Sequence, residues 1–318
     1  MEIGLLEIAS ILQQHDNFHI LTHKSPDGDT LGSAFALCLA LQRMGKKAKV
    51  LCSDEIPEKY DFLSKNVLVQ GFEPDYIISV DLADLQLLGR NLQVYEGKID
   101  LCIDHHPSNK QFAKNWYIEG TSAATAEIIY ELFKILNVDI DVDLANCIYT
   151  GVATDTGCFR HTNTTARTHR IAADMMLLGA EAFKINKIMF DTKSKARINL
   201  EKIAFASMEL FCDDKCAIIS YSNEELALLN ASDSDFDGIS ALPRQVEGVL
   251  VGVLVKEKEP GVFRVSVRTD DAIDASKICE NFGGGGHKNA AGCTFNGVIE
   301  DVKHKLLVVI SETLGAAK

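Results

Sequence analysis

The chain has 318 residues, of which 47% are apolar, and it carries a formal net charge of −13. A chain of this length buries at least one large core and fits two domains better than one. The strong negative charge argues against a protein that binds long nucleic acid, because such binding needs an extended basic surface. No apolar run approaches the roughly 20 residues of a membrane span, and the acidic, amphipathic N-terminus is unlike a signal peptide. We therefore expect a cytoplasmic protein with no membrane contact.

The first 190 residues alternate short apolar runs with longer amphipathic segments. Apolar runs that end in polar residues predict strands at 18–23, 49–52, 76–80 and 99–103. Apolar residues at helical spacing predict helices at 4–14, 30–44, 121–136, 142–154 and 165–179. Thr121 or Ser122 is expected to cap the third of these helices. The alternation predicts the α/β class, with an N-terminal parallel sheet covered by helices.

From about residue 183 to residue 210 the pattern stays helical but becomes charged, which is typical of an exposed connector between domains. We therefore expect three parts, at 1–190, 191–210 and 211–318, the second being a helical linker. In the last part, strands are expected at 217–221, 248–255, 262–268 and 292–295. Helices are expected at 223–230, 235–244, 274–281 and 298–313. This pattern predicts that the last part is a smaller α/β domain with its own core.

Acidic and imidazole side chains follow the predicted strands of the first domain. The carboxyl ends of parallel strands meet at one edge of a sheet, which is where open α/β sheets place ligands. A further aspartate comes at the end of the helical run 142–154. The candidate residues are His23, Asp27, Asp29, Asp81, His105 and Asp155.

These six residues supply two imidazoles and four carboxylates, the mixed nitrogen and oxygen donors that suit Mn²⁺ or a related ion. If one carboxylate bridges, the set is large enough for two ions. Each residue also has a simpler explanation, since Pro-Asp-Gly-Asp is a common turn and an aspartate at a strand end often caps a helix. The simpler explanations would all have to hold together, and the combination therefore favours a metal centre.

Four motifs in order resemble those of the DHH phosphoesterases: T-H-x-x-P-D-G-D at 22–29, a lone aspartate after an apolar strand at 81, I-D-H-H-P at 103–107 and A-T-D-T-G at 153–157. The resemblance implies that His23, Asp27 and Asp81 hold one metal. It implies that Asp81 is shared with a second metal, whose other ligands are those matching Asp29, His105 and Asp155. His106 is expected to be catalytic together with Asp81, facing the substrate phosphate and protonating the leaving oxygen. Asp84 and Asp104 are expected to orient ligands.

The sequence FGGGGHKNAAG at 282–292 resembles the glycine-rich motif of the DHH-associated domain. Glycine N–H groups can approach a phosphate without obstruction from a β-carbon, and an arginine fork suits a terminal phosphate. A flexible turn and a surface arginine at a helix end are the simpler explanations. The expected substrate-binding residues are Gly284, Gly285, Gly286, His287, Arg268 and, more weakly, Arg244.

The compact two-domain layout resembles the nano-RNase branch of the family, which degrades very short oligoribonucleotides and removes the 3′-phosphate of adenosine 3′,5′-bisphosphate. The resemblance implies in-line hydrolysis at two Mn²⁺ ions, with Mg²⁺ or Co²⁺ as substitutes. The partners are then short oligoribonucleotides or small nucleotides, not long nucleic acid. A cyclic or linear dinucleotide phosphodiesterase, a pyrophosphatase and a non-catalytic nucleotide sensor stay open as alternatives. A homodimer also stays open.

Overall fold

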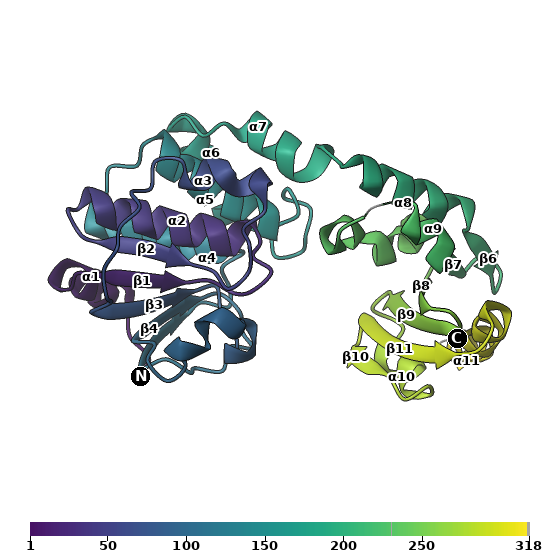
Figure 1. Cartoon of the computed structure of the whole chain (residues 1–318). Coiled ribbons are helices and arrows are strands. Elements are labelled where there is room, and N and C mark those ends of the chain that lie inside the picture. The colour runs from purple at the N-terminus through teal and green to yellow at the C-terminus, as the bar shows by residue number, and fades with distance from the viewer. Residues whose placement is uncertain (230, 317–318) are drawn as a thin grey trace. The chain divides into compact units, whose positions relative to one another are not determined.

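The computed structural model describes residues 1–229 and 231–316, which divide into two units, Met1–Thr192 and Lys193–Lys318 (Figure 1). The stretch 191–210, expected as a linker, contains helix α8 (Lys195–Ala206). Leu200 and Ala204 of this helix are fully buried in a hydrophobic cluster with strands of the second unit. The helix is therefore amphipathic, with an apolar side packed in the second unit, although four of its twelve residues are charged.

The first unit is built on a five-stranded sheet of order β2-β1-β3-β4-β5, in which all neighbouring strands are parallel. The strands are β1 (Phe18–Leu21), β2 (Ala48–Leu51), β3 (Tyr76–Val80), β4 (Leu101–Asp104) and β5 (Asn115–Ile118). The expected parallel α/β architecture is confirmed. Strand β5 was not expected, because this edge strand is only half-buried and its sequence, NWYI, mixes polar and aromatic residues.

Helices pack on one face of this sheet, where strand residues such as Ile20 and Ile78 join the largest hydrophobic cluster. In the cartoon α2 and α4 lie along the strands (Figure 1), and α2 also packs against α5. The contact with α5 is close because Gly32 faces the backbone of that helix. The α-helices of the unit are α1 (Leu5–Gln14), α2 (Gly28–Arg43), α3 (Asp61–Ser64), α4 (Thr125–Leu136), α5 (Val142–Asp155), α6 (Ala166–Leu177) and α7 (Ala182–Asn186).

The opposite face of the sheet is covered by a segment that the sequence did not predict. It contains the 3₁₀ helices η2 (Leu85–Leu87) and η3 (Arg90–Tyr95), and Leu88 and Leu92 pack against Leu21 of β1. Short 3₁₀ turns have no sustained apolar period, so the sequence pattern does not reveal them. The other irregular elements of this unit are η1 (Glu58–Tyr60) and the π-helical turn η4 (Lys187–Asp191).

The second unit has a six-stranded mixed sheet of order β10-β11-β9-β8-β7-β6, in which only β7 and β8 are parallel. Its strands are β6 (Glu209–Phe211), β7 (Cys216–Tyr221), β8 (Val251–Glu259), β9 (Val262–Thr269), β10 (Gly285–His287) and β11 (Ala290–Asn296). The four expected strands are present. The two edge strands, β6 and β10, were missed because each has three residues and neither is buried.

Helices cover both faces of this second sheet, with α10 and α11 on one face and α8 on the other. The helix expected at 235–244 is wrong: two 3₁₀ helices occupy the region, and Pro243 lies in the second. The helix expected at 223–230 is shorter, and residue 230 lies outside the described residues. The helical elements are α9 (Asn223–Ala227), η5 (Asp233–Phe236), η6 (Ile239–Gln245), α10 (Ala275–Glu280) and α11 (Ile299–Ala316).

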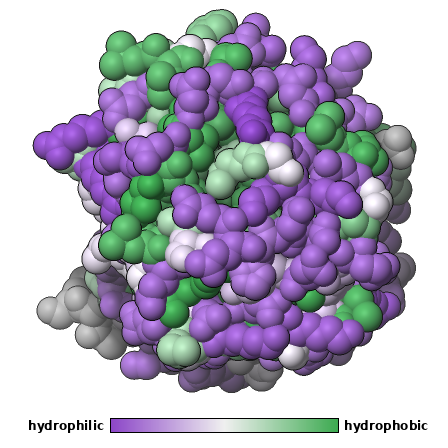
Figure 2. Space-filling model, turned by 90° about the vertical axis from the view of Figure 1, so that its left-hand side faces the viewer, coloured by the Kyte–Doolittle hydropathy of each residue, from purple (hydrophilic) through white to green (hydrophobic). Residues whose placement is uncertain are grey.

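Figure 2 shows one face of the molecule, on the side of the first unit, where hydrophilic residues predominate and apolar residues gather in smaller groups between them. This exterior agrees with a chain in which 24% of the residues are charged. Over the residues that the structure describes, no helix combines the length and the apolar character needed to cross a membrane.

The contact between α2 and α5 leads to a stability prediction. A β-carbon added at Gly32 would lie 2.5 Å from the Cys147 carbonyl oxygen and 3.0 Å from the Gly151 nitrogen. We expect Gly32→Ala to lower the free energy of unfolding by about 1–3 kcal/mol, because overpacking outweighs the better helix propensity of alanine. Urea unfolding followed by circular dichroism measures the change.

Gly71→Ala is the matched control, because Gly71 is exposed and an added β-carbon would meet no atom within 4 Å. The close approach of α2 and α5 would be contradicted if the two variants unfolded at the same urea concentration.

Candidate metal centre

The structure brings the six predicted ligands together at the carboxyl-terminal edge of the first sheet. Asp27 caps α2, accepting hydrogen bonds from the nitrogens of Asp29 (3.0 Å) and Thr30 (3.0 Å). His105 follows β4, and the other four ligands come from the ends of their own elements. The six residues are His23 after β1, Asp27 and Asp29 at the start of α2, Asp81 after β3, His105 after β4 and Asp155 at the end of α5.

One group of potential ligands lies around His23. The Nε2 atom of His23 is 3.8 Å from Oδ1 of Asp27 and 3.7 Å from Oδ2 of Asp81. Its Nδ1 atom lies 2.7 Å from the carbonyl oxygen of Lys24, and only an N–H can pair with a carbonyl. The lone pair of the neutral ring is therefore on Nε2, which faces the two carboxylates.

A second group lies around His105 and has the same arrangement. Nε2 of His105 is 3.9 Å from Asp29 Oδ2, 3.7 Å from Asp81 Oδ1 and 3.6 Å from Asp155 Oδ2. Nδ1 of His105 donates to the Ser122 carbonyl oxygen at 3.1 Å. A backbone partner on one ring nitrogen fixes the ring and frees the other nitrogen for a metal, as is usual for metal-binding histidines.

Asp81 lies between the two groups, with one carboxylate oxygen toward each imidazole. The residue has a left-handed backbone (φ 54°) and is 3% exposed. This backbone conformation costs free energy for a non-glycine residue. The conformation persists only where the surrounding structure enforces it. Here the Asp81 nitrogen donates to the Ile103 carbonyl oxygen (2.9 Å) and Oδ1 accepts the Thr125 hydroxyl (3.0 Å). The two carboxylate oxygens of Asp81 therefore face the two groups of candidate ligands.

The donor set fits metal ions better than it fits a network of hydrogen bonds. Nε2 of His105 is buried and has no hydrogen-bond partner among the described residues. Burial raises the pKa of Asp29 well above its usual range, and the Asp81 and Asp155 charges raise it further. Burial and the Asp27 charge raise the pKa of Asp81 to about 7. Ligand atoms on one small ion, each about 2.0–2.2 Å from it, lie about 3–4 Å apart, which is the spacing found here.

Asp29 also serves the start of helix α4. Its two carboxylate oxygens accept hydrogen bonds from the nitrogens of Thr125 (2.7 Å) and Ala126 (3.0 Å), the first residues of that helix. The expected cap at Thr121 or Ser122 is therefore wrong, because a carboxylate from another segment satisfies these N–H groups. A helix N-terminus interacts favourably with a carboxylate, and these two hydrogen bonds fix the orientation of Asp29.

His106 is oriented by the buried carboxylate of Asp104. The His106 Nδ1–H donates to Asp104 Oδ1 at 2.8 Å, and Nδ1 is 3.6 Å from Asp81 Oδ1. The hydrogen bond to Asp104 raises the pKa of His106 to about 9, and the imidazole is therefore protonated at neutral pH in the metal-free protein. Asp104 itself is fixed by the Asn109 amide, at 2.6 Å from Oδ2. His106 is 43% exposed on its side chain, so the ring can reach a bound molecule.

Two further residues hold the ligands and were missed by sequence reasoning. Thr125 contacts both Asp29 and Asp81, and Asn163 donates to the side chain of Asp155 (3.3 Å) and to its carbonyl oxygen (3.2 Å). Thr125 starts a helix and Asn163 lies in a turn, and nothing in the local sequence distinguishes them from ordinary residues at such positions. Asp84, expected to orient a ligand, instead caps η2 through the Gln86 nitrogen (2.9 Å).

The predicted substrate-binding residues all lie in the second unit. Arg268 is on β9, where its Nη1 donates to the Val267 carbonyl oxygen (3.1 Å). Arg244 is paired with Asp270 at 3.3 Å and is therefore already engaged. The glycines Gly285 and Gly286 and the exposed His287 form edge strand β10, which pairs with β11.

At two of these positions, packing explains why the residue is glycine. A β-carbon at Gly284 would lie 2.2 Å from the Gly292 carbonyl oxygen, and one at Gly286 would lie 2.6 Å from the Ala290 carbonyl oxygen. Gly286 also has φ of 152°, which side-chain-bearing residues rarely adopt. Packing against β11 therefore demands glycine at 284 and 286, whereas Gly285 has open space.

The fold and the cluster together define an α/β protein with a candidate metal centre at the carboxyl ends of a parallel sheet. Comparison with known families identifies it further. The model described as "DHH family, N-terminal domain" matches residues 17–152, and the "DHHA1 domain" matches residues 226–316. The chain thus carries a DHH domain and a DHHA1 domain.

Similar proteins extend over nearly the whole chain. The "Bifunctional oligoribonuclease and PAP phosphatase NrnA" of Thermus thermophilus is 29% identical, covering 98% of this chain and 94% of its own length. The protein of the same name from Bacillus subtilis is 21% identical, over 91% of this chain and 92% of its own. The family and these relatives indicate a hydrolase.

Among solved structures, an exopolyphosphatase-related protein from Bacteroides fragilis has the same fold. It superimposes with a TM-score of 0.85 and 23% identity, covering 98% of this chain and 97% of its own. The α/β fold class is thus shown for both parts of the chain.

The contact between Thr125 and Asp81 generates a prediction about metal affinity. Thr125→Val keeps the shape of the side chain but removes the hydroxyl donor to Asp81 Oδ1. We expect Mn²⁺ to bind about 10- to 100-fold more weakly, which is the usual cost of losing a group that orients a metal ligand. Isothermal titration calorimetry with Mn²⁺ measures the affinity.

Thr150→Val is the matched control, since Thr150 is a buried threonine whose hydroxyl donates only to the Asn146 carbonyl oxygen within α5 (2.7 Å). Equal Mn²⁺ affinities of the two variants would show that Thr125 does not orient Asp81.

Proposed function

We propose that the protein is a Mn²⁺-dependent phosphoesterase that hydrolyses short oligoribonucleotides to mononucleotides and adenosine 3′,5′-bisphosphate to AMP and phosphate. One observation carries the proposal: six imidazole and carboxylate side chains converge on the two faces of Asp81, with the unpaired Nε2 of His105 buried among them. The names of the Thermus and Bacillus relatives combine the same two activities. The net charge of −13 favours a small anionic substrate over a long one.

His23, Asp27 and Asp81 would hold one ion, and Asp29, Asp81, His105 and Asp155 would hold the other. The ions supply Lewis acidity, a lower pKa for the attacking water and compensation of negative charge. The mixed imidazole and carboxylate donors fit Mn²⁺, with Mg²⁺ and Co²⁺ as substitutes.

In the proposed reaction, water attacks phosphorus in line and releases a proton to solvent while the bond to the leaving oxygen breaks. His106 donates its proton to that oxygen, because Asp104 holds the ring protonated and the ring is accessible. Asp104 and Thr125 do not touch substrate in this scheme. They keep His106 and Asp81 in place.

The second unit would supply an anion site for a terminal phosphate. Arg268 is the stronger candidate, with its guanidinium fork, and the exposed His287 lies on the strand next to β11. Gly285 has open space on its Cα, which leaves its backbone accessible. Arg244 is the weakest candidate because Asp270 already neutralises it.

The proposal is tested by turnover with Mn²⁺ on parallel substrates: RNA of two to five residues, a 24-residue RNA, adenosine 3′,5′-bisphosphate, cyclic di-AMP and pyrophosphate. We expect the short RNA and the bisphosphate to be consumed preferentially. Turnover of cyclic di-AMP alone would support the dinucleotide phosphodiesterase instead, and turnover of pyrophosphate alone would support a pyrophosphatase. Binding of these nucleotides without any turnover would indicate a sensor.

Asp81→Asn is the inactivating variant for these assays. Asparagine tolerates the left-handed backbone of this position and keeps the side-chain volume, so that the variant removes charge with little strain. We expect turnover to fall by more than the roughly 100-fold cost of losing an outer-shell partner. Asp84→Asn is the control, since Asp84 follows the same strand but caps η2, a role that asparagine also fills. A similar loss in both variants would contradict the assignment.

The anion site in the second unit has a separate test. We expect Arg268→Gln to raise KM about tenfold for a 5′-phosphorylated RNA of three residues, because a charge-assisted contact to the terminal phosphate is lost. Arg264→Gln is the matched control, four residues earlier on the same strand and more exposed. Steady-state kinetics with and without the terminal phosphate measure the effect, and equal KM changes for the two RNAs would rule out a phosphate contact.

A further inference from the structure

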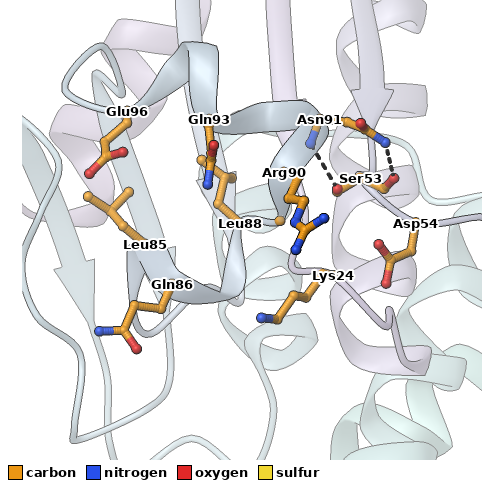
Figure 3. A pocket seen from close by; sticks show the side chains of 11 residues that line it. Lys24, Ser53, Asp54, Leu85, Gln86, Leu88, Arg90, Asn91, Gln93 and Glu96 are labelled. Atoms are coloured by element: carbon orange, nitrogen blue, oxygen red, sulfur yellow. Dashed lines mark hydrogen bonds between the residues drawn. The ribbon is translucent and has the colours of Figure 1, made fainter.

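A pocket of about 650 Å³ lies in the first unit at the same edge of the sheet as the metal cluster (Figure 3). Its lining comes from the loops after β1 and β2 and from the η2–η3 segment after β3. Lys24, which lines it, directly follows the predicted ligand His23. The volume is within the range of about 300–1,000 Å³ typical of small-molecule sites. The pocket is therefore placed to receive part of a molecule whose phosphate is at the metals.

Two positive side chains, Lys24 and Arg90, point into this pocket (Figure 3). Neither side chain makes an ion pair or a hydrogen bond with any other described residue. The nearby Asp54 accepts hydrogen bonds at Oδ2 from the Ser25 nitrogen (2.9 Å) and hydroxyl (3.4 Å), which hold this carboxylate against its own loop. Glu96 lies toward the opposite end of the pocket in Figure 3. Lys24 and Arg90 thus share one end of the pocket with the carboxylate of Asp54 (Figure 3), and this end carries an excess of positive charge.

Hydrogen bonds and a close glycine contact connect the segments that form the walls of the pocket. The Asn91 nitrogen donates to the Ser53 hydroxyl (3.2 Å), and its amide donates to the Ser53 carbonyl oxygen (2.8 Å). The Lys24 nitrogen donates to the Leu87 carbonyl oxygen (2.6 Å). Gly89 has φ of 82°, and a β-carbon there would lie 2.4 Å from Ser53 Cβ. These contacts tie the η2–η3 segment to the two loops, so that the cationic end is preformed.

The remaining lining combines apolar and amide groups. Leu85 and Leu88 present apolar surface, while Gln86, Asn91 and Gln93 carry amides that can donate or accept hydrogen bonds. A nucleoside has the same combination, since its base has apolar faces and a polar edge. Phosphate pairs well with a lysine ammonium and an arginine fork held close together.

We propose that this pocket takes the nucleotide unit that adjoins the scissile phosphate, with the non-scissile phosphate of that unit between Lys24 and Arg90. The inference rests on the proposed function and specifies its substrate. For adenosine 3′,5′-bisphosphate, the 3′-phosphate is then at the metals and the 5′-phosphate is in the pocket. The pocket selects nucleotides that carry a second phosphate over those that carry one.

The test compares adenosine 3′,5′-bisphosphate with adenosine 3′-monophosphate, which lacks the second phosphate, in the Mn²⁺-loaded full chain. We expect kcat/KM for the bisphosphate, relative to the monophosphate, to fall about tenfold in Arg90→Gln and in Lys24→Gln. Lys98→Gln removes one charge from the same unit outside the pocket, and we expect the wild-type ratio in this control.

The proposal is overturned if Arg90→Gln and Lys24→Gln keep the wild-type ratio. An equal loss of kcat/KM on both substrates leaves the ratio unchanged and counts as this outcome. It is also overturned if Arg268→Gln alone lowers the ratio, because the phosphate is then held in the second unit. If neither substrate is hydrolysed, the proposed function fails. Calorimetric titration of the bisphosphate into the Mn²⁺-loaded protein then tests whether the pocket binds the second phosphate. A tenfold weaker affinity in Arg90→Gln supports it, and an unchanged affinity overturns it.

Discussion

The first unit depends on the placement of several buried carboxylates at one edge of a parallel sheet. Asp29 and Asp81 are almost fully buried and lie within 4 Å of the same imidazole nitrogen. Buried like charges are costly unless positive charge or hydrogen-bond donors compensate them. The N-terminus of α4 and the Thr125 hydroxyl compensate part of the charge. The proposed metal ions would compensate the rest and would also give the unbonded Nε2 of His105 a partner.

This constraint explains several local features of the structure that otherwise look unfavourable. Asp81 keeps a left-handed backbone because that conformation turns its two oxygens toward different imidazoles. Gly151 has no room for a β-carbon, which would lie 2.7 Å from Asp29 Oδ1. Helix α4 begins without a cap of its own because Asp29 caps it. Local strain is thus concentrated where these carboxylates are placed.

Much of the architecture could be predicted from the sequence, and the failures share a cause. Buried strands such as β3 are continuous apolar runs, whereas β5, β6 and β10 are exposed edge strands without such a pattern. The ligand candidates could be named because each follows a recognisable strand or helix. Thr125 and Asn163 could not, since their partners are distant in sequence. The pocket that contains Lys24 and Arg90 could not be predicted either, because Arg90 belongs to an irregular 3₁₀ segment.

If Asp81 is shared by two metal ions, as proposed, its replacement removes a ligand from both. The most direct measurement is the number of Mn²⁺ ions that remain bound per chain after gel filtration, determined by atomic emission in the wild type and in Asp81→Asn. We expect two ions in the wild type and loss of both in the variant, since each ion loses a ligand. One ion in the wild type, or two retained in Asp81→Asn, would contradict it.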